Sequence, residues 1–444
     1  MKHTELNRRN FMATSAASAA GLLAAGSAGA ATGGFTPRKV APGATIGAHP
    51  PPPFSKAEYQ DRLNRVRERM AKDNIDMLFV TMPEDMCYLH GLELNWFQQN
   101  GPKAWGMNSM SAVHVDHDTL IHFDSHDDLM AATSAATDVR RPQSGGGRPY
   151  EGHAMELEAA GWLNGTVGLQ YFSYRPVPAR MKQLETVFEA RGCPLVDGSD
   201  IMAEVRLHKS PAEIDIMIEA ARICDIGLQA IMETLQPGVT ELEVYGEMVR
   251  AMTRAGGGMS GLLSSIKVGG ATFLHGIAST RVVQMGDHVI CDICGVKNRY
   301  HANTARGYFV GDPPKELADL YAMNGRAMET LARHARAGMP LRDLTKIMRE
   351  FYQETGAWQM RQRGEISGFT GGYELGISFP PDWVGWWNFG VGEEDTSEWI
   401  IQERQVFNFE SYSTGSTALI DTFVHETDRC RRLSMTPADL LVVA

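Results

Sequence analysis

The sequence lacks an excess of basic residues and has few cysteines. Its 53 acidic residues outnumber 42 basic ones, which gives a formal net charge of -11 at pH 7. Nucleic acids and anionic membrane surfaces select basic patches, so this balance argues against both as partners. Six cysteines in 444 residues are too few for a disulfide scaffold. Beyond the N-terminal region, no apolar run reaches the length of a membrane-spanning helix.

The first 30 residues resemble a twin-arginine export signal. Arg8 and Arg9 precede a weakly apolar, Ala-rich stretch that ends in an Ala-Gly-Ala run at residues 28–30. Such a small-x-small run is typical of signal peptidase cleavage. The alternative is a chance arginine pair on a tail. We expect residues 1–30 to be a signal peptide, residues 31–54 a Pro/Gly/Ala-rich linker, and the mature protein to be periplasmic.

Two domains are expected after the linker. In residues 55–204, short apolar runs alternate with helical patterns, which predicts an α/β domain. The second domain, residues 205–437, opens with a helix. Ser210 is a good N-cap, Pro211 takes the first helical position, and Glu213 completes a capping box.

A second helix with the same capping pattern begins after Thr240, and strands follow it. The periodicity then predicts a further pair of helices followed by more strands. The expected strands are 264–268, 288–293, 305–310, 373–379, 405–411 and 418–425, and the expected later helices are 315–336 and 341–356.

Five positions in the second domain carry the most specific signal. Asp292 lies on an expected strand, and Asn303 stands eleven residues later on the returning strand. A Gly-Tyr-x-x-Gly run contains Tyr373, Glu410 ends a later strand, and Ile420 lies on the last one. This frame resembles the superfamily of methionine aminopeptidase, prolidase and creatinase, the "pita-bread" hydrolases.

The resemblance implies an N-terminal α/β domain followed by an α+β pita-bread catalytic domain. It also implies that the five positions above correspond to the ligands of a two-metal centre. Asp292 and Glu410 are retained, whereas Asn303, Tyr373 and Ile420 replace ligands. Zinc, manganese and related ions prefer His nitrogen or anionic oxygen, which these three do not supply. We therefore expect no metal ligands and no cofactor.

Four residues are the expected catalytic groups: His275, Asp292, Tyr373 and Glu410. The resemblance places His275 where a histidine touches substrate and moves protons, and imidazole titrates near neutral pH. Two close carboxylates cannot both ionise cheaply, so one pKa of the acidic pair should rise. Tyr373 is suited to donate to a developing oxyanion. In the alternative interpretation, one carboxylate bonds to Tyr373 or Asn303 and only holds the sheet together.

Five residues are expected to bind substrate: Asn303, Arg306, Asp382, Trp383 and Trp96. The Arg306 guanidinium suits a bidentate contact with a carboxylate of either substrate or protein. Aromatic faces such as those of Trp96 and Trp383 attract ammonium or amidinium groups. In creatinase-like dimers the N-terminal domain reaches over the partner's pocket, which implies a homodimer. Ordinary packing or burial in a dimer interface is the alternative role of the aromatic residues.

Two stretches sharpen the resemblance toward metal-free members of the superfamily. Arg299-Tyr300-His301, and the run from Tyr373 through Pro-Pro-Asp to Trp383, resemble ectoine hydrolase-like proteins. Creatinase-like proteins are a second metal-free group. The implied activity is hydrolysis of a C–N bond in a small cationic or zwitterionic compound. Glu410 stands where no carboxylate is expected in an ectoine hydrolase, so ectoine itself is not assigned as the substrate.

Three other functions stay open at this stage: a metal-dependent Xaa-Pro aminopeptidase, a lyase acting on a sulfonium or betaine solute, and a non-catalytic periplasmic binding protein. The Cys-x-x-Cys run of Cys291 and Cys294 lies on an expected strand. Positions three apart on a strand face opposite sides, so two buried thiols are expected rather than a redox pair or a zinc site.

Overall fold

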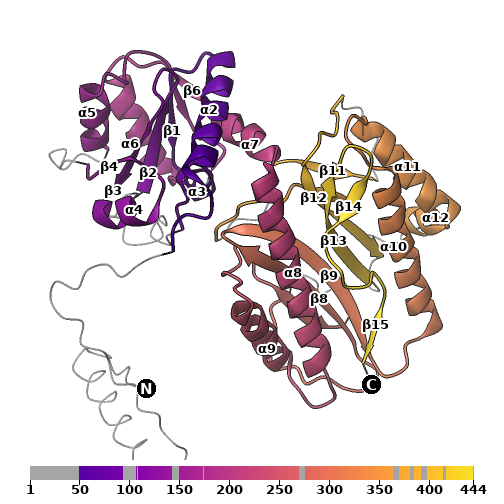
Figure 1. Ribbon diagram of the computed structural model, residues 1–444. Helices are drawn as coiled ribbons and strands as arrows, with labels where there is room; N and C mark the ends of the chain where they lie inside the picture. Colours follow the sequence, from indigo (N-terminus) through magenta and orange to yellow (C-terminus); the bar gives the residue numbers. More distant parts are fainter. Residues whose placement is uncertain are drawn as a thin grey trace, which may run out of the picture. The chain divides into compact units, whose positions relative to one another are not determined.

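The computed structural model (Figure 1) describes residues 50–443, apart from 94–106, 108, 143–149, 174, 270–275, 364–369, 381–384, 392–397 and 414–416. No helix in this described part is both long and apolar enough to cross a membrane.

The N-terminal domain is a six-stranded mixed sheet with helices packed around it (Figure 1). The strand order is β4-β3-β2-β1-β5-β6, with β1 antiparallel to β2 and parallel to β5. Its elements are α2 (Lys56–Lys72), β1 (Met77–Val80), α3 (Pro83–His90), β2 (Ser109–His114), β3 (Leu120–Asp124), α4 (Asp127–Thr133), β4 (Asp138–Arg140), α5 (Glu151–Ala159), β5 (Val167–Leu169), α6 (Pro178–Glu189), β6 (Leu195–Asp197) and α7 (Ser199–Leu207).

The second domain is built on a nine-stranded sheet whose main path runs β11-β10-β12-β13-β9-β8-β7. Two short strands extend it, since β14 pairs with β13 and β15 with β9. Its elements are α8 (Pro211–Thr234), α9 (Glu241–Arg254), β7 (Ser265–Val268), β8 (His288–Lys297), β9 (Tyr300–Val310), α10 (Lys315–His334), α11 (Leu341–Glu354), α12 (Ala357–Gln362), β10 (Gly371–Tyr373), β11 (Asn388–Gly390), β12 (Val406–Ser413), β13 (Thr417–His425), β14 (Cys430–Arg432) and β15 (Leu441–Val443).

Each half of the second domain pairs two helices with its own strands. Helix α8 packs on β8 and β9, and α10 packs on β12 and β13 (Figure 1). Both expected capping boxes are present, because Ser210 bonds reciprocally with Glu213 at the start of α8 and Thr240 does so with Glu243 at the start of α9. Each box satisfies backbone donors that the first helical turn would otherwise leave without partners.

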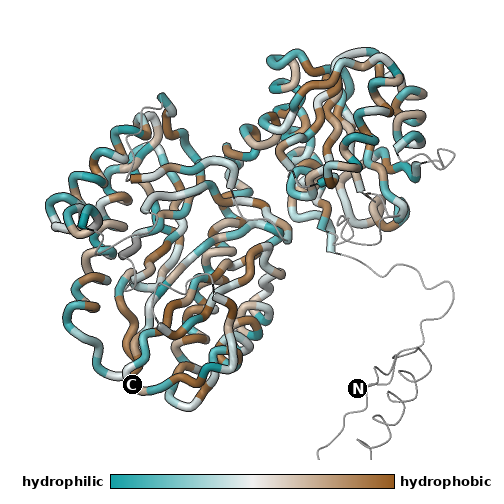
Figure 2. Tube along the Cα trace, turned by 180° about the vertical axis from the view of Figure 1, so that it is seen from behind, coloured by the Kyte–Doolittle hydropathy of each residue, from teal (hydrophilic) through white to brown (hydrophobic). Residues whose placement is uncertain are grey.

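The apolar residues gather where the helices meet the sheets. Hydrophobic residues are frequent along the strands of both domains, and the helices carry both hydrophilic and hydrophobic residues (Figure 2). Strands β8 and β9 are buried along nearly their whole length. The polar residues on these central strands therefore lie in a low-dielectric interior, where every donor and acceptor requires a partner.

The predicted fold class is confirmed: an α/β domain is followed by an α+β domain. The expected strand at 373–379 is wrong in extent, because β10 ends at Tyr373. Beyond it, only isolated bridges at Glu374 and Ile377 join the sheet. Gly376 and the proline at 380 interrupt the run, since glycine weakens a strand and proline removes a ladder donor.

Candidate active site

Strands β8 and β9 bring Asp292 and Asn303 together at the centre of the large sheet. Antiparallel pairing sets Asp292 opposite Ala305 and Asn303 opposite Cys294. The Asn303 Nδ2 atom donates to Asp292 Oδ1 over 2.7 Å. Asn303 is fully buried and Asp292 is 6% exposed. The carboxylate therefore relies on a neutral amide as a hydrogen-bond partner.

A second amide continues this contact to the other acid. Asn408 Nδ2 donates to Asn303 Oδ1 over 3.1 Å and to Glu410 Oε1 over 2.9 Å. Together Asn303 and Asn408 form what we call the amide bridge, which links Asp292 to Glu410. Strand alternation puts Asn408 and Glu410, two residues apart on β12, on the same face of the sheet.

The orientation of the amide bridge is fixed by the backbone. The amide N–H of Tyr373 donates to Asn408 Oδ1 over 2.8 Å. A backbone N–H can only donate, so the side-chain atom facing it is the Asn408 oxygen, and its nitrogen faces Asn303 and Glu410. The Asn303 oxygen then faces Asn408, and its nitrogen faces Asp292. Each carboxylate thus receives an N–H from the bridge.

The two carboxylates are coupled electrostatically. Burial raises the pKa of Asp292 to about 7, the Glu410 charge adds to the rise, and the Asn303 hydrogen bond opposes it. Burial also raises the pKa of Tyr373, with further upward contributions from the charges of Glu410 and Asp292 and from a hydrogen bond with Glu410. Near neutral pH, Tyr373 is a neutral phenol and the acidic pair holds a proton that exchanges in the physiological range.

Both cysteines of the Cys-x-x-Cys run are buried free thiols on β8, as expected. Cys294 lies beside the amide bridge, where Asn303 Nδ2 approaches its sulfur at 3.7 Å. Burial raises the pKa of Cys294, and the charge of Asp292 adds to that rise. Cys294 is therefore held as a thiol, which is a weak nucleophile.

Arg306 lies away from the acidic pair and contacts a carboxylate of the protein. Its Nη2 atom donates to both oxygens of Asp421 at 3.0 Å, and its Nε and Nη1 atoms bond the Pro437 and Ile420 carbonyls. The side chain is fully buried. The sequence left open whether Arg306 contacts a carboxylate of the substrate or of the protein. In the structure its partner is the protein's own Asp421.

The remaining predicted site positions are Ile420 and four residues that the structure does not describe. Ile420 is fully buried and pairs in register with Glu410, so an apolar side chain takes the place of the last expected ligand. His275, Trp96, Asp382 and Trp383 lie outside the described residues. Their roles stay predictions from the sequence.

Asn408 was not predicted as a site residue, although it contacts both Asn303 and Glu410. A signal was present in the sequence, because Asn408 precedes Glu410 by two positions on an expected strand and must share its face. Phe407 and Phe409, on either side of Asn408, belong to the hydrophobic core.

The donor set does not suit the two-metal centre implied by the resemblance. Asn303 directs its N–H toward Asp292, so at this contact a hydrogen-bond donor faces the carboxylate oxygen that would otherwise bind a cation. Tyr373 is a neutral phenol and Ile420 has no ligand atom. Within the described residues, no group of three or more His, Cys, Asp or Glu side chains could hold a metal ion. Transition metals in proteins are usually held by at least three nitrogen or anionic ligands.

Comparisons with known proteins give consistent matches over both domains. The Creatinase/Prolidase N-terminal domain family matches residues 62–208, and the Metallopeptidase family M24 matches residues 215–424. Ectoine hydrolase of Halomonas elongata is 25% identical over 392 residues, which cover 80% of this chain and 89% of that protein. Xaa-Pro dipeptidase of Pyrococcus furiosus is 25% identical over 247 residues, with 54% and 67% covered.

Solved structures agree on the fold. An Xaa-Pro dipeptidase from Bacillus anthracis superposes with a TM-score of 0.70 at 19% identity, over 87% of this chain and 100% of that one. The X-Pro aminopeptidase from Thermotoga maritima gives a TM-score of 0.68 at 20% identity, with 86% and 99% covered. At this level of identity, the likeness supports the two-domain architecture and nothing about substrate.

Proposed function

Since the chain belongs to the pita-bread superfamily of the M24 metallopeptidases and creatinase, we propose that it is a metal-independent hydrolase acting on a C–N bond of a small cationic or zwitterionic compound. The observation that carries the proposal is the buried pair Asp292 and Glu410, joined through the amide bridge. A sheet that needed only stability would gain little from two like charges in its interior. A carboxyl group whose pKa is raised toward neutrality beside a second carboxylate is suited to acid–base catalysis.

The protonation states of Asp292 and Glu410 are compatible with hydrolysis. With its pKa near 7, Asp292 holds a proton in a large fraction of molecules at neutral pH. In the proposed reaction, Glu410 accepts a proton from water as the water oxygen bonds to the substrate carbon. Protonated Asp292 donates to the nitrogen as the C–N bond breaks. One proton enters the pair and one leaves it, so its total protonation is unchanged after a turnover.

Tyr373 completes the described part of the proposed site. Its neutral phenol is suited to donate to the oxygen that becomes negative when water adds, a contact typically worth about 3–4 kcal/mol when preorganised. The same two carboxylates would attract a positively charged substrate. His275 is included in the proposal on the strength of the resemblance alone, as a group that activates water or protonates the leaving nitrogen.

Metal independence is supported by the donor set of the amide bridge. Replacing a metal with an amide N–H keeps a partially positive group beside Asp292 without requiring anionic ligands around it. The ectoine hydrolase relative is consistent with C–N bond hydrolysis, and the dipeptidase relative keeps a metal-dependent Xaa-Pro peptidase as the second candidate. These two candidates differ most clearly in their metal content.

The decisive experiment is elemental analysis of protein purified without chelator or affinity metal, followed by a hydrolysis screen of amidines, ureas and cyclic amides. We expect transition metal well below one equivalent per chain, and turnover that resists EDTA. One to two equivalents of metal, with EDTA-sensitive release of an N-terminal residue from peptides, would establish the peptidase instead. Ligand affinity without turnover would indicate a binding protein, and elimination products would indicate a lyase.

Matched variants assign the chemistry. Asp292→Asn, Glu410→Gln and His275→Ala should each lower kcat by about 100-fold or more while the far-UV circular dichroism stays unchanged. Asp319→Asn, which removes a carboxylate from an exposed ion pair on α10, serves as the control. Full activity of the Asp292 and Glu410 variants would refute the proposed roles of the pair.

Export and dimerisation belong to the proposal but depend on sequence patterns and resemblance. The protein should appear in the periplasmic fraction, and replacing Arg8 and Arg9 with Lys should retain it in the cytoplasm. Light scattering should give twice the chain mass. Finding the unmodified protein in the cytoplasm would refute the proposed export. A monomer at micromolar concentration would refute the proposed dimer.

A further inference from the structure

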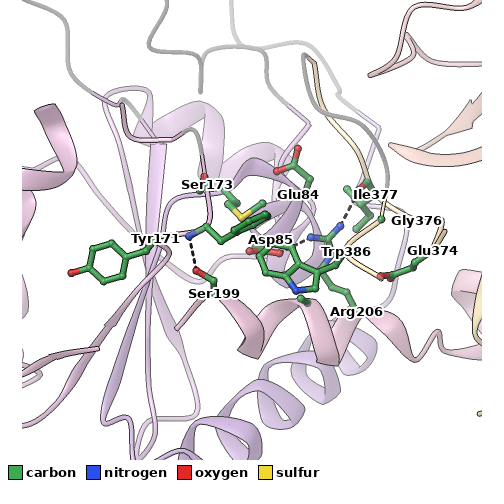
Figure 3. A pocket seen from close by; sticks show the side chains of 14 residues that line it. Glu84, Asp85, Tyr171, Ser173, Ser199, Arg206, Glu374, Gly376, Ile377 and Trp386 are labelled. Atoms are coloured by element: carbon green, nitrogen blue, oxygen red, sulfur yellow. Dashed lines mark hydrogen bonds and ion pairs between the residues drawn. The ribbon is translucent and has the colours of Figure 1, made fainter. Parts of the chain in front are cut away.

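A cavity that is separate from the amide bridge opens beside helix α7 (Figure 3). Its volume is about 420 Å³, which is within the range for a small organic ligand. Helices α3 and α7, the turn after β5 and the segment that follows β10 supply its lining. Asp292, Asn303, Asn408 and Glu410 are not among the described residues that line it.

The wall of this cavity is acidic. Among the described residues that line it, the charged side chains are Glu84, Asp85, Glu374 and Arg206. All three carboxylates are buried, with residue exposures of 3%, 1% and 5%. Their charges act through a poorly solvated wall, so they attract a cation more strongly than exposed carboxylates would.

Arg206 is already engaged on both of its terminal nitrogens. Its Nη1 atom bonds Asp85 Oδ1 over 2.8 Å, and its Nη2 atom donates to the Ile377 carbonyl over 2.9 Å (Figure 3). Glu374 is paired with Lys209 over 2.7 Å. These contacts hold the wall in place before any ligand arrives, and they leave Arg206 poorly placed to recruit an anion.

Glu84 is the third carboxylate of the wall. Its Oε1 atom accepts the backbone N–H of Phe379 over 3.1 Å, which fixes its orientation. Arg206 interacts electrostatically with all three carboxylates, those of Asp85, Glu374 and Glu84. The three carboxylates outnumber the two cations paired with them, Arg206 and Lys209, by one, so the described part of the wall favours a positively charged occupant.

Aromatic side chains supply the other part of the lining. Phe172 and Trp386 meet edge to face with ring centroids 4.7 Å apart. Phe172 is 72% exposed and Tyr171 is 38% exposed, so both keep apolar surface in contact with water. A ligand with a flat apolar body would cover these rings, and its charged end would gain from the carboxylates and from cation–π contact.

We propose that this cavity is a binding site for a small organic cation, an amidinium or ammonium group carried on an aromatic or aliphatic body. The acidic wall recognises the charge and the Phe172–Trp386 pair covers the apolar part. The site is distinct from the candidate active site, and the proposal is independent of the proposed hydrolysis. The ligand enters a site whose charged wall is already hydrogen-bonded.

The test uses benzamidine as the probe and benzamide as its neutral match, with binding measured by isothermal titration calorimetry on the full mature chain. We expect benzamidine to bind at least tenfold more tightly than benzamide, and higher salt to weaken the difference. Glu84→Gln keeps the oxygen that accepts from Phe379 and removes the charge. This variant should weaken the binding of benzamidine by about tenfold, which corresponds to about 1.4 kcal/mol, and leave the binding of benzamide unchanged.

Trp386→Ala should weaken both probes several-fold, because the apolar cover is lost for each. Glu247→Gln on the outer face of α9 is the surface control for both variants, and thermal unfolding checks that each is folded. Equal binding of the two probes, or benzamidine affinity unaffected by both Glu84→Gln and Trp386→Ala, would overturn the proposal. Binding lost in Glu410→Gln but retained in Glu84→Gln would place the cation in the active site and would also overturn it.

Discussion

Two buried aspartates flank strand β9, and that strand gives each a different partner. Asp292 on β8 receives the neutral amide of Asn303, whereas Asp421 on β13 receives the Arg306 guanidinium. Asn303 and Arg306 are three residues apart on β9 and so point to opposite faces. One strand therefore supports a compensated ion pair on one face and a coupled acidic pair on the other.

The difference lies in how each charge is balanced. Asp421 is fully buried and receives N–H groups from Arg306 and from Arg432, the latter at 3.2 Å. Burial raises the pKa of Asp421, but both cations oppose the rise. For Asp292, burial and the Glu410 charge act in the same direction. Removing one partner of the first arrangement would leave an uncompensated buried charge, whereas the acid–base role proposed for the second depends on the raised pKa of Asp292.

The largest expected effect comes from breaking the compensated pair. Arg306→Met leaves Asp421 with less compensation in the interior and removes the donors to the Ile420 and Pro437 carbonyls. We expect it to lower the free energy of unfolding by about 3–5 kcal/mol, measured by urea denaturation. Adding Asp421→Leu should recover part of that loss. Lys315→Met on the exposed face of α10 is the control, and an Arg306→Met protein as stable as the parent would contradict the interpretation.

An effect of similar size, spread over about three pH units, is expected from Asp292→Asn, and its sign depends on pH. The folded pKa near 7 lies above the ordinary value of 3.8, so the folded protein holds this proton more tightly than the unfolded chain. Stability should therefore fall between about pH 4 and pH 7, by about 1.4 kcal/mol per pH unit from this group. Asp292→Asn removes that slope, and above pH 7 the variant should be more stable than the parent.

Urea titrations at pH 4, 5.5 and 7.5 measure this slope for the two proteins side by side. Asp287→Asn, at a partly exposed position before β8, provides a matched control. Parallel pH profiles for Asp292→Asn and the parent would show that Asp292 titrates normally, and the contrast with Asp421 would then fail.

The smallest expected effect is that of Glu410→Gln, which tests the coupling alone. The Glu410 charge contributes to the raised pKa of Asp292, although burial contributes more. Without that charge, the pH window in which stability falls should move to lower pH but not disappear. We expect a gain of about 1 kcal/mol above pH 7, read from the same titrations. A window that stays in place would mean that the two carboxylates do not interact.

Much of the fold was predictable because its signals are local. The two capping boxes at Ser210 and Thr240 lie within four residues of sequence, and the expected helix starts are confirmed. The strand predicted across 373–379 failed because its end depends on Gly376 and on pairing with distant residues such as Tyr300. Strand ends depend on tertiary contacts, which a local pattern does not carry.

The candidate site was predictable as a set of positions and less so as a set of contacts. The eleven-residue spacing of Asp292 and Asn303 indicated that both lie on paired strands, and the structure joins them by a hydrogen bond. The sequence does not identify the partner of Arg306, because Asp421 is 115 residues away. The acidic cavity gave no sequence signal, because Glu84, Phe172 and Arg206 are brought together only by the tertiary fold.

The amide bridge also limits how this protein can change. Changing Asn303 to Asp would remove the N–H that Asp292 receives and place a third carboxylate in the same interior. Only a cation arriving in the same step would offset that repulsion, and Tyr373 and Ile420 would still contribute no anionic or histidine ligand. Asn303→Asp is therefore expected to destabilise the protein when no cation is present, because Asp292 loses its N–H partner and gains a like charge nearby.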